Sequence, residues 1–145
     1  MKLALARITF WALCLGMLSC GESQLNTYPT IEAARADRLF ARGWMPDVLP
    51  NGSGPIVEAH DLDSNARCSR AAFPSGAIAE VSAALNSHGF VPFSGALPAL
   101  PFARCPFSLA DAQQGRPSLH KTNHALSDTE FAVISEEGVL YFWSS

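Results

Sequence analysis

The sequence predicts an α+β fold, a small antiparallel sheet built from two hairpins with about two helices packed on one face. Two observations support this prediction. Apolar residues recur every three or four positions in two segments, which predicts helices. Two other pairs of segments have strand patterns, and a short turn joins the members of each pair. Strand and helix patterns do not alternate along the chain, which argues against a parallel sheet.

Two helices are expected, at residues 30–42 and 75–89. Thr30 and Ser75 can each accept a hydrogen bond from a free backbone N–H group in the first turn of these helices. Gly43 suits the end of the first helix, because glycine readily adopts the left-handed conformation that closes many helices.

Four strands are expected in two hairpins. Ile56–Leu62 has a strand pattern, although neither of its faces is cleanly apolar, and Arg67–Phe73 can return beside it after a turn. Glu130–Ser135 and Val139–Trp143 form the second pair, joined by a turn in which Gly138 allows a left-handed residue.

No helix or strand is predicted for residues 90–117. They hold five of the ten prolines and four of the nine phenylalanines. Irregular segments of this length are uncommon in compact domains. Because this one is rich in phenylalanine, we expect it to pack over the core.

The first twenty residues are typical of an exported bacterial lipoprotein. Lys2 and Arg7 precede the uncharged run Ile8–Leu18, which as a helix would be about 16 Å long, roughly half the hydrocarbon thickness of a bilayer. That length fits a signal peptide better than a spanning anchor. Met17-Leu18-Ser19-Cys20 then resembles a lipobox, after which the cysteine becomes the acylated first residue. An ordinary secretory leader with an incidental cysteine is the alternative.

This resemblance implies a domain plan and a location. Residues 1–19 are the signal peptide, residues 20–29 the lipidated Cys20 and a flexible tether, and residues 30–145 a single α+β domain. Gly21 stands where aspartate is the usual signal for retention at the inner membrane. We therefore expect a cell-envelope protein held by its N-terminal lipid at the outer membrane and facing the periplasm, with the membrane as one partner.

Charge and cysteine usage narrow the partners and the chemistry. The leader carries two of the ten basic residues and none of the thirteen acidic ones, so the mature charge is −5. Since the sequence has no basic patch, RNA motif or zinc-finger spacing, no nucleic-acid partner is expected.

Once Cys14 leaves with the leader and Cys20 is acylated, Cys68 and Cys105 remain. Export permits a disulfide between them, worth roughly 4 kcal/mol on a chain-entropy estimate. Two buried thiols are the alternative.

Residues 43–65, with the sequence GWMPDVLPNGSGPIVEAHDLDSN, resemble a pattern found in small uncharacterised bacterial lipoproteins. In these proteins a Gly-Trp pair, a Pro-x-x-Leu/Phe-Pro step and a His-Asp-Leu/Ile-Asp-Thr/Ser-Asn hairpin recur. A chain end rich in Tyr and Trp also recurs, here Tyr141-Phe142-Trp143. The family brings no known activity, so the resemblance implies the export class and the fold and leaves the function open.

One pattern suggests a calcium site but is incomplete. Asp61, Asp63 and Asn65 have the spacing that opens a calcium loop, but Ala66 and Ala72 replace the glycine and the glutamate that the loop requires. Capping of a hairpin turn by the Asp and Asn side chains explains the pattern better. No metal or other cofactor is therefore predicted.

Three histidines leave one enzymatic alternative open. His120 and His124 stand four residues apart, but Lys121 occupies the place of the glutamate that a zinc protease needs after its first histidine. With His60 they could form a three-histidine site of a metal-dependent hydrolase. No Gly-x-Ser-x-Gly elbow presents a serine nucleophile, and an enzyme is not expected.

The leading functional hypothesis is a non-catalytic envelope lipoprotein that binds a partner protein. Aromatic side chains on a loop or sheet face could supply a rigid apolar surface, although each taken alone is more typical of a core. The candidates are Trp44, Phe93, Phe102, Phe107 and Trp143. A small inhibitor of an exogenous lysozyme or toxin is a further alternative that fits the same gross features.

Overall fold

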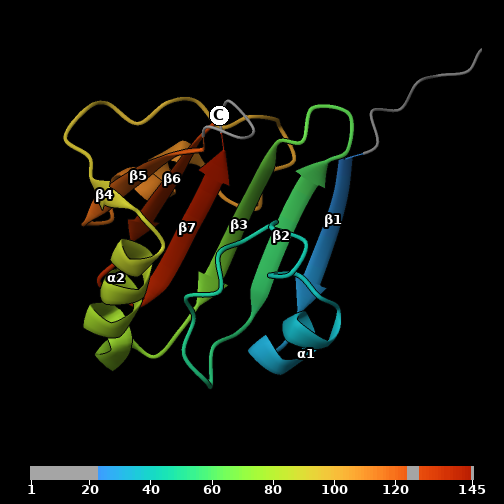
Figure 1. The fold of residues 1–145 in the computed structure, drawn as a ribbon, viewed down its shortest axis with the longest axis horizontal. Helices are drawn as coiled ribbons and strands as arrows, with labels where there is room; N and C mark the ends of the chain where they lie inside the picture. Colours follow the sequence, from blue (N-terminus) through green and yellow to red (C-terminus); the bar gives the residue numbers. More distant parts are fainter. Residues whose placement is uncertain (1–22, 124–127, 145) are drawn as a thin grey trace, which may run out of the picture.

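The computed structural model describes residues 23–123 and 128–144, and it shows one seven-stranded antiparallel sheet (Figure 1). The strands are β1 (Ser23–Tyr28), β2 (Ile56–Asp61), β3 (Arg67–Ala72), β4 (Val91–Pro92), β5 (Ser118–Asn123), β6 (Asp128–Ile134) and β7 (Val139–Ser144). Their order across the sheet is β1-β2-β3-β7-β6-β5-β4, and every neighbouring pair is antiparallel.

Two meanders meet in the middle of this sheet. β1, β2 and β3 are neighbours in both sequence and space, as are β4, β5, β6 and β7, and the β3–β7 pair joins the two groups. The predicted fold class is therefore wrong. The two expected hairpins correspond to β2–β3 and β6–β7, but three further strands extend the sheet on both sides and make the domain richer in strand than predicted.

The edge strand β1 occupies most of the segment that was expected to be a flexible tether. Its pairing with β2 runs from Ser23 opposite Asp61 to Tyr28 opposite Ile56. Only Tyr28 is buried in this strand. Backbone hydrogen bonds to β2 therefore hold a polar sequence in place without an alternating apolar pattern. For residues 23–28 the tether interpretation is wrong.

Helices α1 (Ile31–Ala36) and α2 (Ile78–Ser87) lie on the same side of the sheet (Figure 1). The Thr30 hydroxyl accepts a hydrogen bond from the N–H of Ala33 at 3.3 Å, as its position predicted. The first helix is shorter than expected, because Arg38 already adopts the left-handed conformation with φ 63°. None of the helices among the described residues is both long and apolar enough to cross a bilayer.

The sheet separates two apolar clusters. We call the side that carries α1 and α2 the helix face. Its cluster includes Ile31, Leu39, Val81, Leu85, Phe90, Ile134, Leu140 and Phe142. The opposite side is the loop face, where the cluster includes Ala59, Cys68, Phe107, Phe131, Tyr141 and Trp143.

The segment between β4 and β5 covers the loop face. It is irregular except for α3 (Leu109–Gln113), and Phe93, Phe102 and Phe107 pack from it onto the sheet, as expected for residues 90–117. A disulfide ties this segment to β3, with the Cα atoms of Cys68 and Cys105 5.6 Å apart. The predicted disulfide is confirmed.

Candidate functional site

A row of buried polar side chains crosses the helix face near one end of the sheet. Successive side chains of a strand point to opposite faces, so Glu58 and His60 of β2, Arg67 of β3 and Glu130 of β6 share this face with the helices. All four residues are at most 8 % exposed. Charged residues are almost never buried unless they are paired, so these four, which we call the polar row, mark the candidate site.

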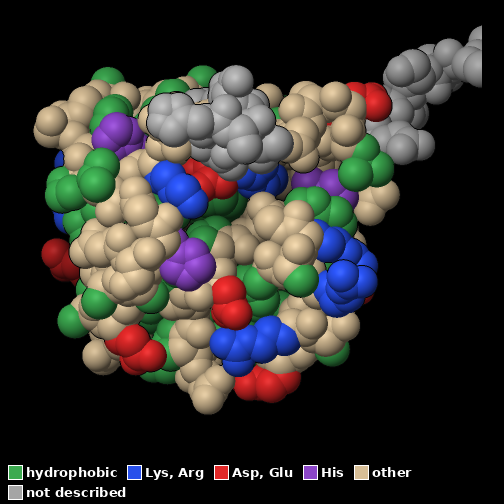
Figure 2. All heavy atoms as spheres, viewed as in Figure 1, with side chains coloured by type: hydrophobic (Ala, Val, Ile, Leu, Met, Phe, Trp, Pro, Cys, Tyr) green, Lys and Arg blue, Asp and Glu red, His purple; other side chains and the backbone are tan. Residues whose placement is uncertain are grey.

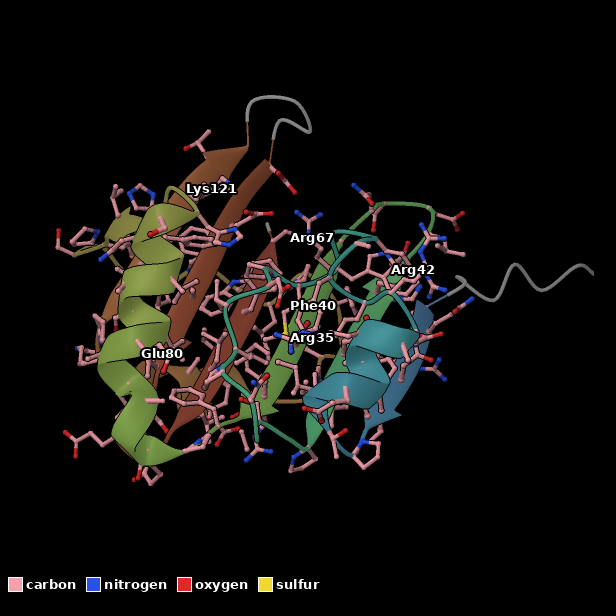
Figure 3. The ribbon with its side chains drawn as sticks, turned by 60° about the horizontal axis from the view of Figure 1, so that its bottom comes forward. Arg35, Phe40, Arg42, Arg67, Glu80 and Lys121 are labelled. Atoms are coloured by element: carbon pink, nitrogen blue, oxygen red, sulfur yellow. A yellow bond between two sulfur atoms is a disulfide. The ribbon has the colours of Figure 1, made fainter. Side chains whose placement is uncertain are left out.

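Arg67 is the centre of a charge network in this row. Its guanidinium pairs with Glu130 and, at 3.4 Å, with Asp128, and the Lys121 Nζ lies 4.0 Å from the second Glu130 oxygen. Side-chain exposure rises from 4 % at Arg67 through 11 % at Glu130 to 37 % at Lys121. Lys121 is therefore the member that a ligand reaches most easily. Figure 3 shows Lys121 and Arg67 toward the same end of the sheet.

His60 is held in a stack at the other end of the row. Its Nδ1 lies 3.1 Å from both carboxylate oxygens of Glu58, which also accepts a hydrogen bond of 2.6 Å from Asn26. The imidazole stacks on Trp44 with ring centroids 3.7 Å apart, and the Arg42 guanidinium lies 4.8 Å from the Trp44 ring centre. The His60 Nε2 is buried with no hydrogen-bond partner among the described residues. These contacts fix the ring orientation and shield it from solvent.

A pocket of about 250 Å³ opens beside the charge network. It lies between the end of α2, the segment that follows α1, and strands β5 and β6. The lining residues are Phe40, Gly43, Met45, Pro46, Asp47, His88, Phe90, Lys121 and Glu130. Figure 2 shows a hollow in the middle of this face with histidine, acidic and basic side chains around it. Apolar walls and a charged rim let the pocket take an apolar group while polar atoms orient it.

A larger cavity of about 380 Å³ lies on the loop face. Residues 93–97 form one wall, and Gln113, Arg116 and Ser118 complete it. The Arg116 Nη1 donates to the carbonyl oxygens of Gln113 and Gly115, so the one charged group in this lining is already bonded within the loop. Because the cavity offers so little free chemistry, the smaller pocket on the helix face is the better candidate.

The aromatic residues predicted to form one binding surface do not come together. Trp143 is fully buried and Phe107 is 8 % exposed, both in the cluster of the loop face, so neither contributes to an outer surface. Phe93 and Phe102 are half-buried against that cluster, whereas Trp44 packs on the helix face. The interpretation of Trp143 and Phe107 as surface residues is wrong, because the segment 90–117 covers the face that they occupy.

The three histidines of the hydrolase alternative are not brought together either. His60 points to the helix face, whereas His120 lies beside Phe93 and Phe131 on the loop face, with ring centroids 5.1 and 6.4 Å away. Four strand spacings separate β2 from β5, about 19 Å at the usual spacing. The two histidines therefore cannot bind the same ion. His124 lies outside the described residues.

The Asp61–Asn65 pattern builds a turn. The Asp61 carboxylate accepts hydrogen bonds from the N–H groups of Asp63 at 3.0 Å and Ser64 at 2.9 Å. The bond from Ser64 is the main cause that lowers the pKa of Asp61. Capping of the β2–β3 turn by Asp61 is thus confirmed, and Asn65 takes the left-handed conformation there, with φ 57°.

The structure explains why two parts of the 43–65 pattern occur together. The Trp of the Gly-Trp pair stacks on the His of the His-Asp hairpin, and the following Asp caps the turn. Residues 22–70 match the family model of the YbbD head domain. That match covers 49 of the 145 residues, from β1 to β3, and includes this stack. No curated protein and no solved structure matches the chain.

Sequence reasoning missed the charge network. Arg67 of β3 lies at least 61 residues before its partners Asp128 and Glu130 of β6, and no local motif links them. One signal was present. Glu58 and His60 alternate with other residues on the same face as Ile56, in a strand with no cleanly apolar side. Polar residues at such alternate positions are the sequence pattern expected of buried polar side chains on one face of a sheet.

Proposed function

We propose that this protein is a lipid-anchored, non-catalytic module of the cell envelope that binds a partner protein at the pocket on the helix face. The size of the pocket and the charged groups on its rim support the proposal. At about 250 Å³ it is smaller than the roughly 300–1,000 Å³ of sites for drug-sized ligands, so it suits one inserted side chain of a protein. Lys121 and Glu130 on its rim can orient the polar part of the inserted segment.

The pairing of the charged groups supports binding over catalysis. A general acid or base must come within hydrogen-bond reach of its substrate. His60 is 2 % exposed beneath Trp44, and both carboxylate oxygens of Glu58 face its ring. Glu58 and His60 therefore act on each other, and neither lines the pocket.

The anchor rests on the likeness of Met17–Cys20 to a lipobox. Intact-mass spectrometry of the full chain extracted from membranes tests it. We expect a mature protein that begins at Cys20 and carries fatty acyl groups, and a Cys20→Ser variant without them. A mature N-terminus at any other residue contradicts the anchor.

Site-specific photo-crosslinking in cells tests the pocket. His88, the residue after α2, is exposed on the pocket rim. Glu80, labelled in Figure 3, is exposed about 12 Å further back along the axis of α2. A photoreactive amino acid at position 88 should give a discrete protein adduct, whereas the same residue at position 80 should not. Equal adducts at both positions, or none at either, contradict binding at the pocket.

A pocket-filling variant gives an independent check. His88→Trp places a large side chain at the rim without changing a buried residue, and Glu80→Trp is its matched control on the same helix. We expect the adduct formed from a photoreactive residue at Asp47, which also lines the pocket, to disappear in His88→Trp and to persist in Glu80→Trp. Persistence in both variants contradicts the proposal.

A further inference from the structure

The short connection between Cys20 and the sheet restricts how the domain can sit at a membrane. β1 begins at Ser23, three residues after Cys20, and its pairing with Asp61 fixes that end of the strand in the sheet. Three residues span at most about 11 Å even when fully extended. If Cys20 is acylated, the end of the sheet at Ser23 therefore lies at the bilayer surface.

Two of the most exposed apolar side chains lie at this corner. Leu62 follows Asp61 in the β2–β3 turn and is 51 % exposed, and Leu25 of β1 is 56 % exposed. The third large exposed apolar residue among the described ones, Val91, is 50 % exposed and lies in β4 at the opposite edge of the sheet. Figure 1 shows the start of β1, the β2–β3 turn and the end of β7 at one end of the molecule.

We propose that the corner formed by the start of β1 and the β2–β3 turn rests on the lipid bilayer that holds the anchor, with Leu62 in the interface. This inference rests on the anchor proposed above and adds an orientation to it. The turn is suited to the contact because the Asp61 carboxylate caps it and keeps Leu62 presented outward. Exposed apolar side chains gain free energy by leaving water for the acyl-chain boundary.

The charges at this corner indicate which lipid it accepts. Asp61 and Asp63 carry two negative charges, and Arg104, which donates to the Ser23 carbonyl at 2.9 Å, carries one positive charge. Attraction to anionic lipid needs clusters of basic residues, and the described part of this corner has none. The contact is therefore with a zwitterionic lipid surface and depends on the anchor and the leucines.

Quenching of tryptophan fluorescence by brominated lipid tests this orientation. Lipidated full-length mature protein is reconstituted in vesicles of phosphatidylcholine brominated on the acyl chains. Leu62→Trp is compared with Val91→Trp, its control of equal exposure at the other sheet edge, and the wild-type signal is subtracted from both. We expect severalfold stronger quenching of the tryptophan at position 62. Equal quenching at both positions, or stronger quenching at position 91, overturns the proposed orientation.

A longer connection tests the cause of the orientation. An insertion of about 20 Gly and Ser residues before Ser23 has an r.m.s. reach of about 25 Å and should release the corner from the surface. Quenching of Leu62→Trp should then fall to the level of Val91→Trp, and unchanged quenching overturns the inference.

Vesicle flotation separates the proposed anchor from the proposed orientation. Protein that does not float lacks the anchor, whereas protein that floats with no quenching at position 62 keeps the anchor and loses only the orientation.

Discussion

The two faces of the sheet are covered by different means. On the helix face, α1 and α2 pack regular apolar surfaces against the strands, and a row of buried charges lies among them. On the loop face, an irregular proline-rich segment packs aromatic rings on the sheet, and one disulfide ties it down. Every ion pair with a side chain less than 10 % exposed among the described residues lies on the helix face.

This difference separates two physical tasks. Helices satisfy their own backbone hydrogen bonds, so they can border a pocket and still present side chains at fixed positions. An irregular segment cannot do this unaided, and it needs aromatic contacts and a covalent tie to stay in place. The charges and the pocket are thus expected to serve binding, and the loop face is expected to serve stability.

Removal of the disulfide should have the largest effect on stability. The bond between Cys68 and Cys105 closes a loop with a sequence separation of 37. On the chain-entropy estimate, replacing both cysteines with Ala should lower the free energy of unfolding by roughly 4 kcal/mol. Urea denaturation followed by circular dichroism measures the change. Reductant should destabilise the wild type to a similar extent and leave the double variant unchanged, and a further loss in that variant would show that the reductant acts elsewhere.

The charge network should come next. Arg67→Met leaves Glu130 and Asp128 partly buried without their main cation, and this should cost about 3 kcal/mol of unfolding free energy. Lys121→Met is the matched control, since the Lys121 side chain is 37 % exposed and lies 4.0 Å from Glu130. Its effect should stay within about 0.5 kcal/mol. Equal losses in both variants would contradict the central position of Arg67.

The contrast between the faces also explains which elements could be predicted. β6 and β7 lie inside the sheet and carry the apolar and β-branched residues that are typical of strands, whereas β2 and β3 were predicted from the alternation in Ile56–Leu62 and the turn that follows it. β1 is a polar edge strand held by backbone hydrogen bonds to β2, so its sequence resembles a tether. β5 contains mostly polar residues, and β4 has only two residues, too few for any periodic signal.

The candidate site was less predictable than the fold. The pairing of Cys68 with Cys105 was predicted because removal of the expected leader and acylation of Cys20 would leave only these two cysteines with a thiol. The Arg67 network depends on β3 and β6, which are separated by β7 in the sheet, and Arg67 lies 61 residues before Asp128 and 63 before Glu130 in the chain. The pattern of a single strand carries no such information. Aromatic residues misled the prediction of a binding surface, because a covering segment and an exposed loop can have the same composition.

A smaller effect is expected on the helix face, where the last residue of β1 contacts the residue that follows α1. The Tyr28 hydroxyl donates to Asp37 at 2.7 Å, and burial, followed by that hydrogen bond and the charge of Asp37, raises the pKa of Tyr28 above its ordinary value. Tyr28→Phe should lower the free energy of unfolding by about 1 kcal/mol at neutral pH. Because the pKa is raised in the folded state, the wild-type contribution is complete below about pH 10 and is lost as the pH rises further. The difference between the two proteins, measured by urea denaturation, should therefore shrink above pH 10, and a constant difference would contradict this origin.

The smallest effect is expected on the loop face, where regular structure contributes least. Ser108 and Asp111 form a capping box at the start of α3, and the hydrogen bonds from Ser108 lower the pKa of Asp111. Ser108→Ala should cost about 0.5–1 kcal/mol, and the exposed Ser94→Ala in the same segment should cost nothing measurable. Since the pKa of Asp111 is lowered on folding, its contribution is present above its ordinary pKa and is lost as the pH falls through the folded value. Amide hydrogen exchange of α3 measures both the loss of the cap in Ser108→Ala and the loss of the Asp111 contribution at low pH. If α3 exchanges equally fast in Ser94→Ala and Ser108→Ala, the capping box does not stabilise it, and the disulfide and the aromatic contacts alone order the loop face.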